Sequence, residues 1–87
     1  MAKVQADPRS LREVRAAIDR GQQDITRAVN AMRGSLKKAD WNDERRRSFE
    51  QDLEQVLRSL STFNGKADDL KRYLNRKADE LDRFLSN

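Results

Sequence analysis

Asp40-Trp41-Asn42-Asp43 is the polar stretch that decides the fold, because it holds the only Trp of the chain and separates two long helical patterns. On each side of it, apolar or small residues recur at alternating steps of three and four. This is the spacing of one face of an α-helix. The only proline, Pro8, lies before the first pattern and interrupts neither. The sequence therefore predicts an all-α antiparallel hairpin with its turn at Trp41, Asn42 and Asp43.

The apolar residues of the two patterns form a predicted seam along each helix. Gly21 lies in the middle of the first helix, where alanine would be favoured by about 1 kcal/mol. Close approach of a partner helix would explain this glycine, and the alternative is a tolerated defect without a contact role. The predicted seam comprises Leu11, Val14, Ile18, Gly21, Ile25, Ala28, Met32, Leu36, Phe49, Leu53, Val56, Leu60, Phe63, Ala67, Leu70 and Leu74.

Capping residues set the predicted start of each helix. Asp7 can accept hydrogen bonds from first-turn amides, and Pro8 is tolerated at the first helical position. The first helix is therefore predicted over residues 8–38. Asp43 suits the positive end of the second helix, which is predicted over residues 43–85. We read residues 1–87 as one domain whose first six residues fray.

A turn signal inside the second helix offers a different fold. Asn64-Gly65 is a strong turn dipeptide, and a break there would give a three-helix bundle. However, the seam keeps its step of three and four from Phe63 to Ala67 and beyond, whereas a reversal would shift its phase. One continuous second helix is therefore favoured over the three-helix alternative.

The second helix is predicted to be longer than the first, so its end should extend past its partner. We expect the overhang to begin after about Tyr73. An exposed apolar stripe of this kind usually marks an interaction site. Candidate residues for a tail interaction are Tyr73, Leu81, Phe84 and Leu85, and Leu74 is also expected to be exposed.

Composition narrows both the class of fold and the class of function. Of the 87 residues, 39% are charged and 36% hydrophobic, so a single hairpin has only a thin apolar strip to bury. We therefore predict that the hairpin pairs into a dimeric four-helix bundle. The chain has no Cys and no His, which excludes disulfides, thiolate chemistry and histidine bases. No catalytic, cofactor or metal site is predicted, and we expect a protein that is not an enzyme.

The chain resembles the small WXG, or ESAT-like, proteins of type VII secretion systems. The resemblance rests on Trp41-Asn42-Asp43 near the midpoint, on Phe49 eight residues after the tryptophan, and on the flanking seams. It implies a helical hairpin that pairs, as a homodimer or a heterodimer with a related hairpin, into a four-helix bundle. It also implies a secretion component or a cargo protein as a further partner.

Two positions depart from the family pattern. Asp43 stands where the family has glycine, and Tyr73 is followed four residues later by Lys77 instead of an acid. The resemblance therefore implies a subunit that relies on a partner's export signal or acts as an adaptor. The chain has no hydrophobic signal core and no apolar run long enough to span a membrane. We expect a cytoplasmic protein. The resemblance implies a further possibility, export by a route that needs no signal peptide.

Two other functions fit parts of the sequence. The net charge of +4 suggests a basic helical protein that binds nucleic acid. Its aromatic residues lie on the apolar seam instead of among the basic residues, which makes a solvated helix surface the better interpretation. The second alternative is a generic coiled-coil scaffold subunit. In that case the corner from Asp40 to Asp43 would be only a turn. Trp41 itself has two compatible interpretations: it plugs the end of the bundle, with its indole N–H on a backbone carbonyl, or it contacts a secretion component.

Overall fold

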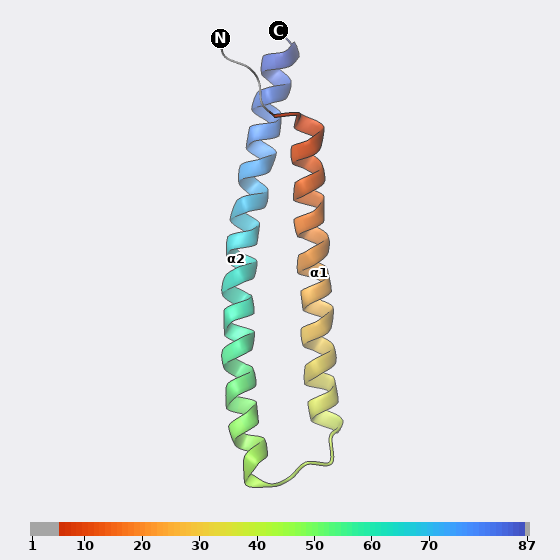
Figure 1. Ribbon diagram of the computed structural model, residues 1–87, viewed down its shortest axis with the longest axis vertical. Coiled ribbons are helices and arrows are strands. Elements are labelled where there is room, and N and C mark those ends of the chain that lie inside the picture. Colours follow the sequence, from red (N-terminus) through yellow and green to blue (C-terminus); the bar gives the residue numbers. More distant parts are fainter. Residues whose placement is uncertain (1–5, 87) are drawn as a thin grey trace.

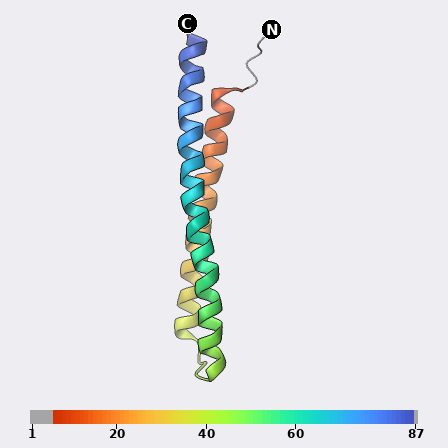
Figure 2. The same ribbon diagram turned by 90° about the vertical axis from the view of Figure 1, so that its left-hand side faces the viewer.

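The computed structural model describes residues 6–86 as two long helices, α1 (Pro8–Lys38) and α2 (Glu44–Ser86), joined by residues 39–43. The two helices lie side by side and antiparallel in a rod with extents of 66 × 18 × 15 Å (Figure 1, Figure 2). The predicted all-α hairpin is confirmed, and α2 begins and ends one residue later than predicted. Of the fraying predicted for residues 1–6, residues 1–5 lie outside the described residues, and Ala6 precedes α1 without helical structure.

Carboxylate caps begin both helices. Asp7 Oδ1 accepts a hydrogen bond from the backbone N–H of Arg9 at 3.0 Å. Asp43 Oδ1 accepts one from the backbone N–H of Arg45 at 2.9 Å. At the other end of α1, Ala39 has an extended backbone (ψ 136°) and cannot continue the helix. These caps satisfy amide groups that a helix start leaves unpaired, and they place the corner where the sequence predicted it.

α2 passes through Asn64 and Gly65 without a break. Gly65 has no positive φ, so the conformational freedom of glycine is not used at this position. Ala67 is buried and Leu60 is half-buried, so the side of α2 that faces α1 continues across the dipeptide. The alternative of a three-helix bundle is therefore wrong, because the apolar spacing outweighs a local turn preference.

The residues between the two helices follow a seven-residue repeat. Along α2, the least exposed positions alternate steps of three and four, as in a coiled coil. Few of these side chains are fully buried: within the described part of α2, the buried residues are Leu57, Ala67 and Ala78. The core of one hairpin is therefore thin. This row consists of Leu53, Leu57, Leu60, Asn64, Ala67, Lys71, Leu74, Ala78 and Leu81.

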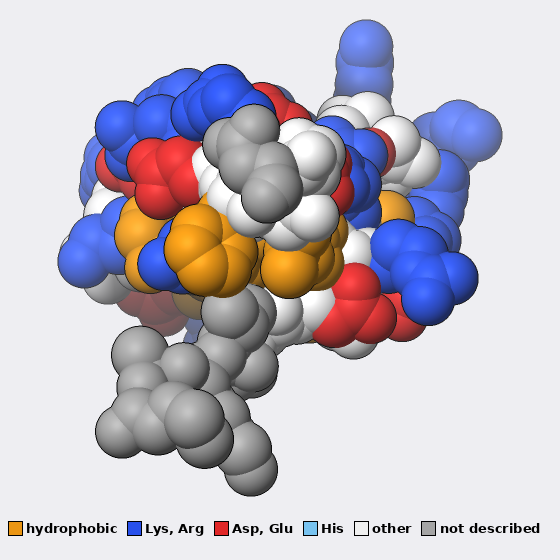
Figure 3. All heavy atoms as spheres, turned by 90° about the horizontal axis from the view of Figure 1, so that it is seen from above, with side chains coloured by type: hydrophobic (Ala, Val, Ile, Leu, Met, Phe, Trp, Pro, Cys, Tyr) orange, Lys and Arg blue, Asp and Glu red, His pale blue; other side chains and the backbone are white. Residues whose placement is uncertain are grey.

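α2 extends beyond α1 at the end that holds both termini, but less than predicted. Arg12 of α1 bonds Asp79 and Asp82, so α1 covers α2 well past Tyr73. The overhang is shorter than predicted because, at the corner, the first turn of α2 extends past the end of α1 (Figure 1). Seen from the terminal end, hydrophobic side chains cluster at the tip with charged side chains around them (Figure 3).

Candidate interaction surface

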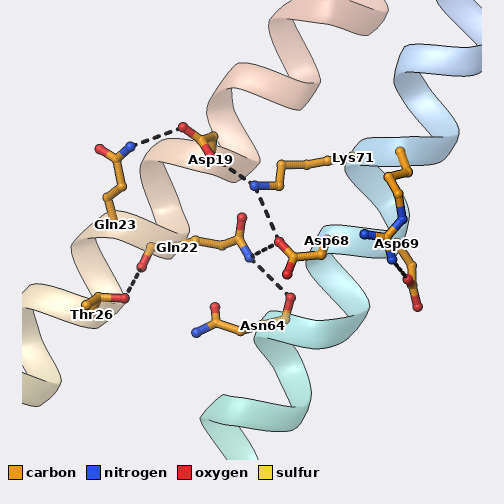
Figure 4. A network of polar contacts seen from close by, with 9 residues as sticks. Asp19, Gln22, Gln23, Thr26, Asn64, Asp68, Asp69 and Lys71 are labelled. Atoms are coloured by element: carbon orange, nitrogen blue, oxygen red, sulfur yellow. Dashed lines mark hydrogen bonds and ion pairs between the residues drawn. The ribbon is translucent and has the colours of Figure 1, made fainter.

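A network of polar side chains ties the two helices together along one long face of the hairpin. Lys71 Nζ lies 2.9 Å from Asp19 Oδ1 and 3.4 Å from Asp68 Oδ1. Gln22 Nε2 donates to Asp68 Oδ1 at 3.0 Å and to the backbone carbonyl of Asn64 at 3.2 Å (Figure 4). Because these contacts join specific residues of α1 and α2, they set the height of one helix against the other.

A second polar tie lies nearer the termini. Arg12 Nη2 lies 3.1 Å from Asp79 Oδ1 and also contacts Asp82. The hydrogen bond to Asp82 is the largest cause that raises the pKa of Arg12 above its ordinary value. We call this side of the hairpin the polar face, defined by Arg12, Asp19, Gln22, Asp68, Lys71, Asp79 and Asp82.

The titrating groups of this network favour their charged forms. The hydrogen bond from Lys71 lowers the pKa of Asp19, and the hydrogen bond from Gln22 lowers the pKa of Asp68. The hydrogen bond to Asp19 raises the pKa of Lys71. All three groups are therefore ionised across the neutral range, and the network holds without a proton transfer.

Two amide side chains of the seam are incompletely satisfied. The Oε1 atom of Gln22 and the Oδ1 atom of Asn64 are buried without a hydrogen-bond partner. A buried polar atom without a partner costs stability. Polar residues in a coiled-coil seam are known to select one register at such a cost. Gln22 and Asn64 thus favour this alignment of the helices over a packing that slides.

The opposite long face of the hairpin has a different character. On α2, Phe49, Val56, Phe63 and Leu70 recur every seven residues, and Phe84 continues the row two repeats later. Each of these side chains is 45% to 65% exposed. The matching row on α1 is Val14, Gly21, Ala28 and Ser35, also seven residues apart. We call these two rows together the apolar face.

A shallow groove near the corner shows that both rows belong to one face. Met32 and Ser35 of α1 line this groove together with Phe49 and Leu53 of α2. The separate hollow on the polar side is lined by residues such as Gln22 and others of the network. The rows of the apolar face differ in size: large side chains on α2 stand beside small ones on α1.

The corner is fixed by Trp41 and by an arginine that bridges the helix ends. Trp41 Nε1 donates to Asp43 Oδ1 at 2.8 Å, and its ring centroid lies 5.3 Å from that of Phe49. Arg46 donates to the backbone carbonyls of Trp41 at 2.9 Å and Leu36 at 3.1 Å. The expected backbone partner of the indole is wrong: the indole N–H donates to the Asp43 carboxylate, a charged acceptor.

The remaining residue of the turn motif stays local. Asn42 Nδ2 donates to Asp40 Oδ1 at 3.3 Å, and Asn42 is exposed. No contact of Asn42 in the structure indicates a role in binding a partner. The chemistry of the corner is therefore structural: it caps α2 and covers one end of the hairpin.

The predicted seam divides into two groups in the structure. One group lies between the helices and is half-buried or buried: Leu11, Ile18, Ile25, Leu53, Leu60, Ala67 and Leu74. The other group is exposed, and most of it forms the apolar face: Val14, Ala28, Met32, Phe49, Val56, Phe63 and Leu70. Gly21 belongs to the apolar face by position and is intermediate in exposure.

Sequence reasoning missed part of the contact between the helices. Leu57 and Ala78 are buried and Val29 is half-buried, whereas Leu36, which the predicted seam includes, is half-buried as a seam residue should be. The available signal was a second seven-residue row beside the first, one position after Val56 and its equivalents. Among the predicted tail residues, Tyr73, Phe84 and Leu85 are exposed and Leu81 is half-buried. Leu74 is half-buried against the expectation that it lies in the overhang, because the overhang begins later.

No family model, curated protein or solved structure matches this chain. Within residues 6–86, no group of three or more acidic side chains is placed to hold a metal ion. Neither α1 nor α2 contains, in its described residues, an apolar stretch of the length that a membrane crossing needs. The functional argument therefore depends on the two long faces of the hairpin.

Proposed function

We infer that this protein is a non-enzymatic interaction module whose apolar face pairs with a second helical hairpin in a four-helix bundle. The observation that carries this proposal is the row Phe49, Val56, Phe63 and Leu70, which remains about half exposed along one face. Burying a side chain of this type stabilises by about 1.5 to 3 kcal/mol. A second helical surface offers the apolar contacts that the hairpin itself does not supply.

The thin core of the hairpin supports the same proposal. The buried hydrophobic residues on α2 are one leucine and two alanines, Leu57, Ala67 and Ala78. Small domains without disulfides or structural metals commonly need association to become stable. Pairing through the apolar face would enlarge this core, because the half-buried leucines beside it would be covered at the same time.

The partner in this proposal is another copy of the chain or a related hairpin. The resemblance of Trp41-Asn42-Asp43 to the WXG motif leads us to propose a role as a partner or adaptor subunit of a type VII secretion system. Loss of the tagged protein from culture medium in a strain without the secretion ATPase would support this role. Equal amounts in the medium of both strains, together with no co-purification of a secretion component from the cells, would refute it.

Ion pairing weighs against the alternative of nucleic-acid binding. Arg12, Arg27, Arg46, Lys71 and Arg72 each pair with a carboxylate of the same chain. Binding to phosphates needs basic side chains that can replace the counterions of the nucleic acid. Three of the five aromatic residues, Phe49, Phe63 and Phe84, lie on the apolar face and not among the basic side chains. These features of the surface favour binding to another helix over binding to a nucleic-acid backbone.

Sedimentation equilibrium of the purified chain tests the proposed module. If the apolar face is an interface, the apparent mass should be about twice that of the 10.2 kDa chain at micromolar concentration. Addition of a related hairpin should give a mixed dimer if that hairpin is the true partner. A stable, fully helical monomer that binds no helical partner would refute the proposal.

A further inference from the structure

We propose that the hairpin covering the apolar face is a second copy of this chain, with both corners at the same end of the bundle. In this arrangement α1 of each copy packs against α2 of the other, about a twofold axis parallel to the long axis of the hairpin. The inference rests on the proposed function, since it takes the apolar face as an interface. It adds the identity and the direction of the partner.

The polar network supplies the height scale for this arrangement. Asp19 contacts Lys71, and Gln22 contacts Asp68, so these residues of α1 and α2 lie level with each other. Because the helices are antiparallel, a residue that lies a given number of positions after Asp19 in α1 is level with the residue that lies the same number of positions before Lys71 in α2. A twofold axis parallel to the rod leaves heights unchanged. The same matching, to within about one residue, then applies between α1 of one copy and α2 of the other.

Side-chain sizes fit this pairing. The small α1 residues Gly21, Ala28 and Ser35 fall opposite the large α2 residues of the second copy. The opposing residues are Leu70, Phe63 and Val56, taken in that order. A large side chain fits into the space beside a small one, which is the packing that interfaces between helices require.

Gly21 gives this fit a specific reason. A Cβ atom added at Gly21 would meet nothing within 4 Å in the hairpin. The lack of a side chain therefore has no cause inside one copy, although glycine in a helix costs about 1 kcal/mol against alanine. Opposite Leu70 of the second copy, the glycine leaves room for a leucine side chain.

Charges beside the apolar face agree with the same direction. Asp24 and Lys38 on α1, and Lys66 and Asp52 on α2, are exposed and lie next to the apolar rows, on the side away from the other helix of the hairpin. The height scale places Asp24 level with Lys66 and Lys38 level with Asp52. Across a parallel twofold axis both pairs bring opposite charges together, and such pairs set the choice and direction of partners.

The reverse direction, with the corners at opposite ends, fits poorly. It would place α2 against α2 around the centre of the row from Phe49 to Phe84. Lys66 would then face Lys66 of the second copy, and Asp52 would face Glu80. Like charges at these positions would oppose the pairing in this register. In addition, Phe63 would meet Leu70 of the other copy while the small α1 residues faced each other across a gap. A register centred on the row from Phe49 to Leu70 would instead bring Asp52 level with Lys66, so the mismatch of side-chain sizes, and not charge, is what argues against the reverse direction in both registers.

Engineered cysteines can distinguish the two directions, because the chain has no Cys of its own. Ala31 and Ser59 are exposed and level with each other, on opposite outer sides of one hairpin. The double variant Ala31→Cys/Ser59→Cys should form a covalent dimer under mild oxidation, since the two positions meet only between copies. Each single variant should stay uncrosslinked, and a mixture of both should crosslink.

The variant Lys66→Cys provides the opposing measurement. Ready formation of a covalent dimer by Lys66→Cys, with no crosslink in the double variant, would overturn the proposed direction. Sedimentation of the unmodified chain distinguishes a wrong direction of pairing from the absence of the interface. A dimer with the wrong crosslinks refutes the direction alone, whereas a monomer refutes the interface itself.

A charge exchange tests the direction without disulfide chemistry. Asp24→Lys should raise the dissociation constant of the dimer about two- to thirtyfold, because the twofold axis repeats the pair and each exposed ion pair accounts for about 1.4- to fivefold. The double variant Asp24→Lys/Lys66→Asp should restore the dissociation constant if the two residues meet between copies. Additive weakening in the double variant would contradict the pairing.

Discussion

The polar face and the apolar face are built on the same two helices, at equivalent distances from the seam, yet they serve different purposes. On the polar face, Asp19, Gln22, Asp68 and Lys71 hydrogen-bond or pair with one another within a single copy. On the apolar face, the row that includes Phe63 reaches solvent and has no comparable partner row of large side chains on α1. The hairpin therefore completes one face internally and presents the other to a partner.

A charge at the centre of the apolar face should have the largest effect. Phe63→Asp would place an unpaired carboxylate in the proposed interface, at a cost of about 3 to 5 kcal/mol of association. Sedimentation equilibrium should show loss of the dimer. Ser61→Asp is the matched control, because Ser61 lies two residues away, is exposed and does not belong to the apolar face. Equal behaviour of the two variants would remove the distinction between the faces.

Truncation of the buried seam should destabilise the hairpin itself. Leu57 is 6% exposed, and Leu57→Ala would remove one of the few large side chains held between the helices. We expect a loss of about 2 to 5 kcal/mol in the free energy of unfolding. Urea denaturation followed by circular dichroism measures this loss. A change below about 0.5 kcal/mol would mean that Leu57 is not part of a packed core.

Replacing a polar residue of the seam should stabilise the protein. Asn64 has a buried Oδ1 atom without a partner, and Asn64→Leu would exchange it for apolar contact. The backbone carbonyl that accepts from Gln22 remains. We expect the free energy of unfolding to rise by about 1 kcal/mol, with a weaker preference for one register. Destabilisation in the same denaturation experiment would show that the Asn64 side chain has a favourable role.

The corner offers a smaller test. Trp41→Phe keeps an aromatic ring beside Phe49 and removes the hydrogen bond to Asp43 together with the second ring of the indole. Unfolding should become easier by about 0.5 to 1.5 kcal/mol, while association through the apolar face is unchanged. Loss of association in this variant would assign Trp41 to the interface.

The smallest effect concerns pH and belongs to the polar face. Asp19 and Asp68 have lowered pKa values, so their contribution to stability is present above the ordinary value of 3.8 and is lost as the pH falls below it. Lys71 has a raised pKa, so its contribution is present below 10.5 and is lost above that pH. Thermal unfolding across this range measures both losses. Lys71→Met should reduce them, and an unchanged pH profile would contradict the network.

The sequence predicted the hairpin because its determinants are local. The caps Asp7 and Asp43 and the uninterrupted apolar spacing act within each helix, and the structure agrees with them. Whether a seam residue faces the other helix or the apolar face depends on a shift of one position, for example from Val56 to Leu57. An apolar stripe of helical spacing does not determine that shift. The overhang was also misplaced, because its length depends on how the extended connection places the start of α2.

The polar contacts were harder still to predict. Helical spacing suggests partners within one helix, but Asp79 contacts Arg12 of α1. Lys71 likewise reaches Asp19, on the other helix. Which carboxylate an arginine or lysine selects depends on the height of one helix against the other. That height depends on contacts over the whole length of the hairpin, the polar network among them, and it is therefore not a property of any short segment.

The concentration dependence of thermal unfolding tests the central claim most directly, namely that the apolar face is completed by a second hairpin. If folding is coupled to pairing, the melting temperature should rise steadily as the chain concentration increases from about 1 to about 100 µM. Phe63→Asp should show a lower melting temperature that does not change with concentration. A melting temperature of the unmodified chain that stays constant over this range, with a fully helical monomer, would contradict the account.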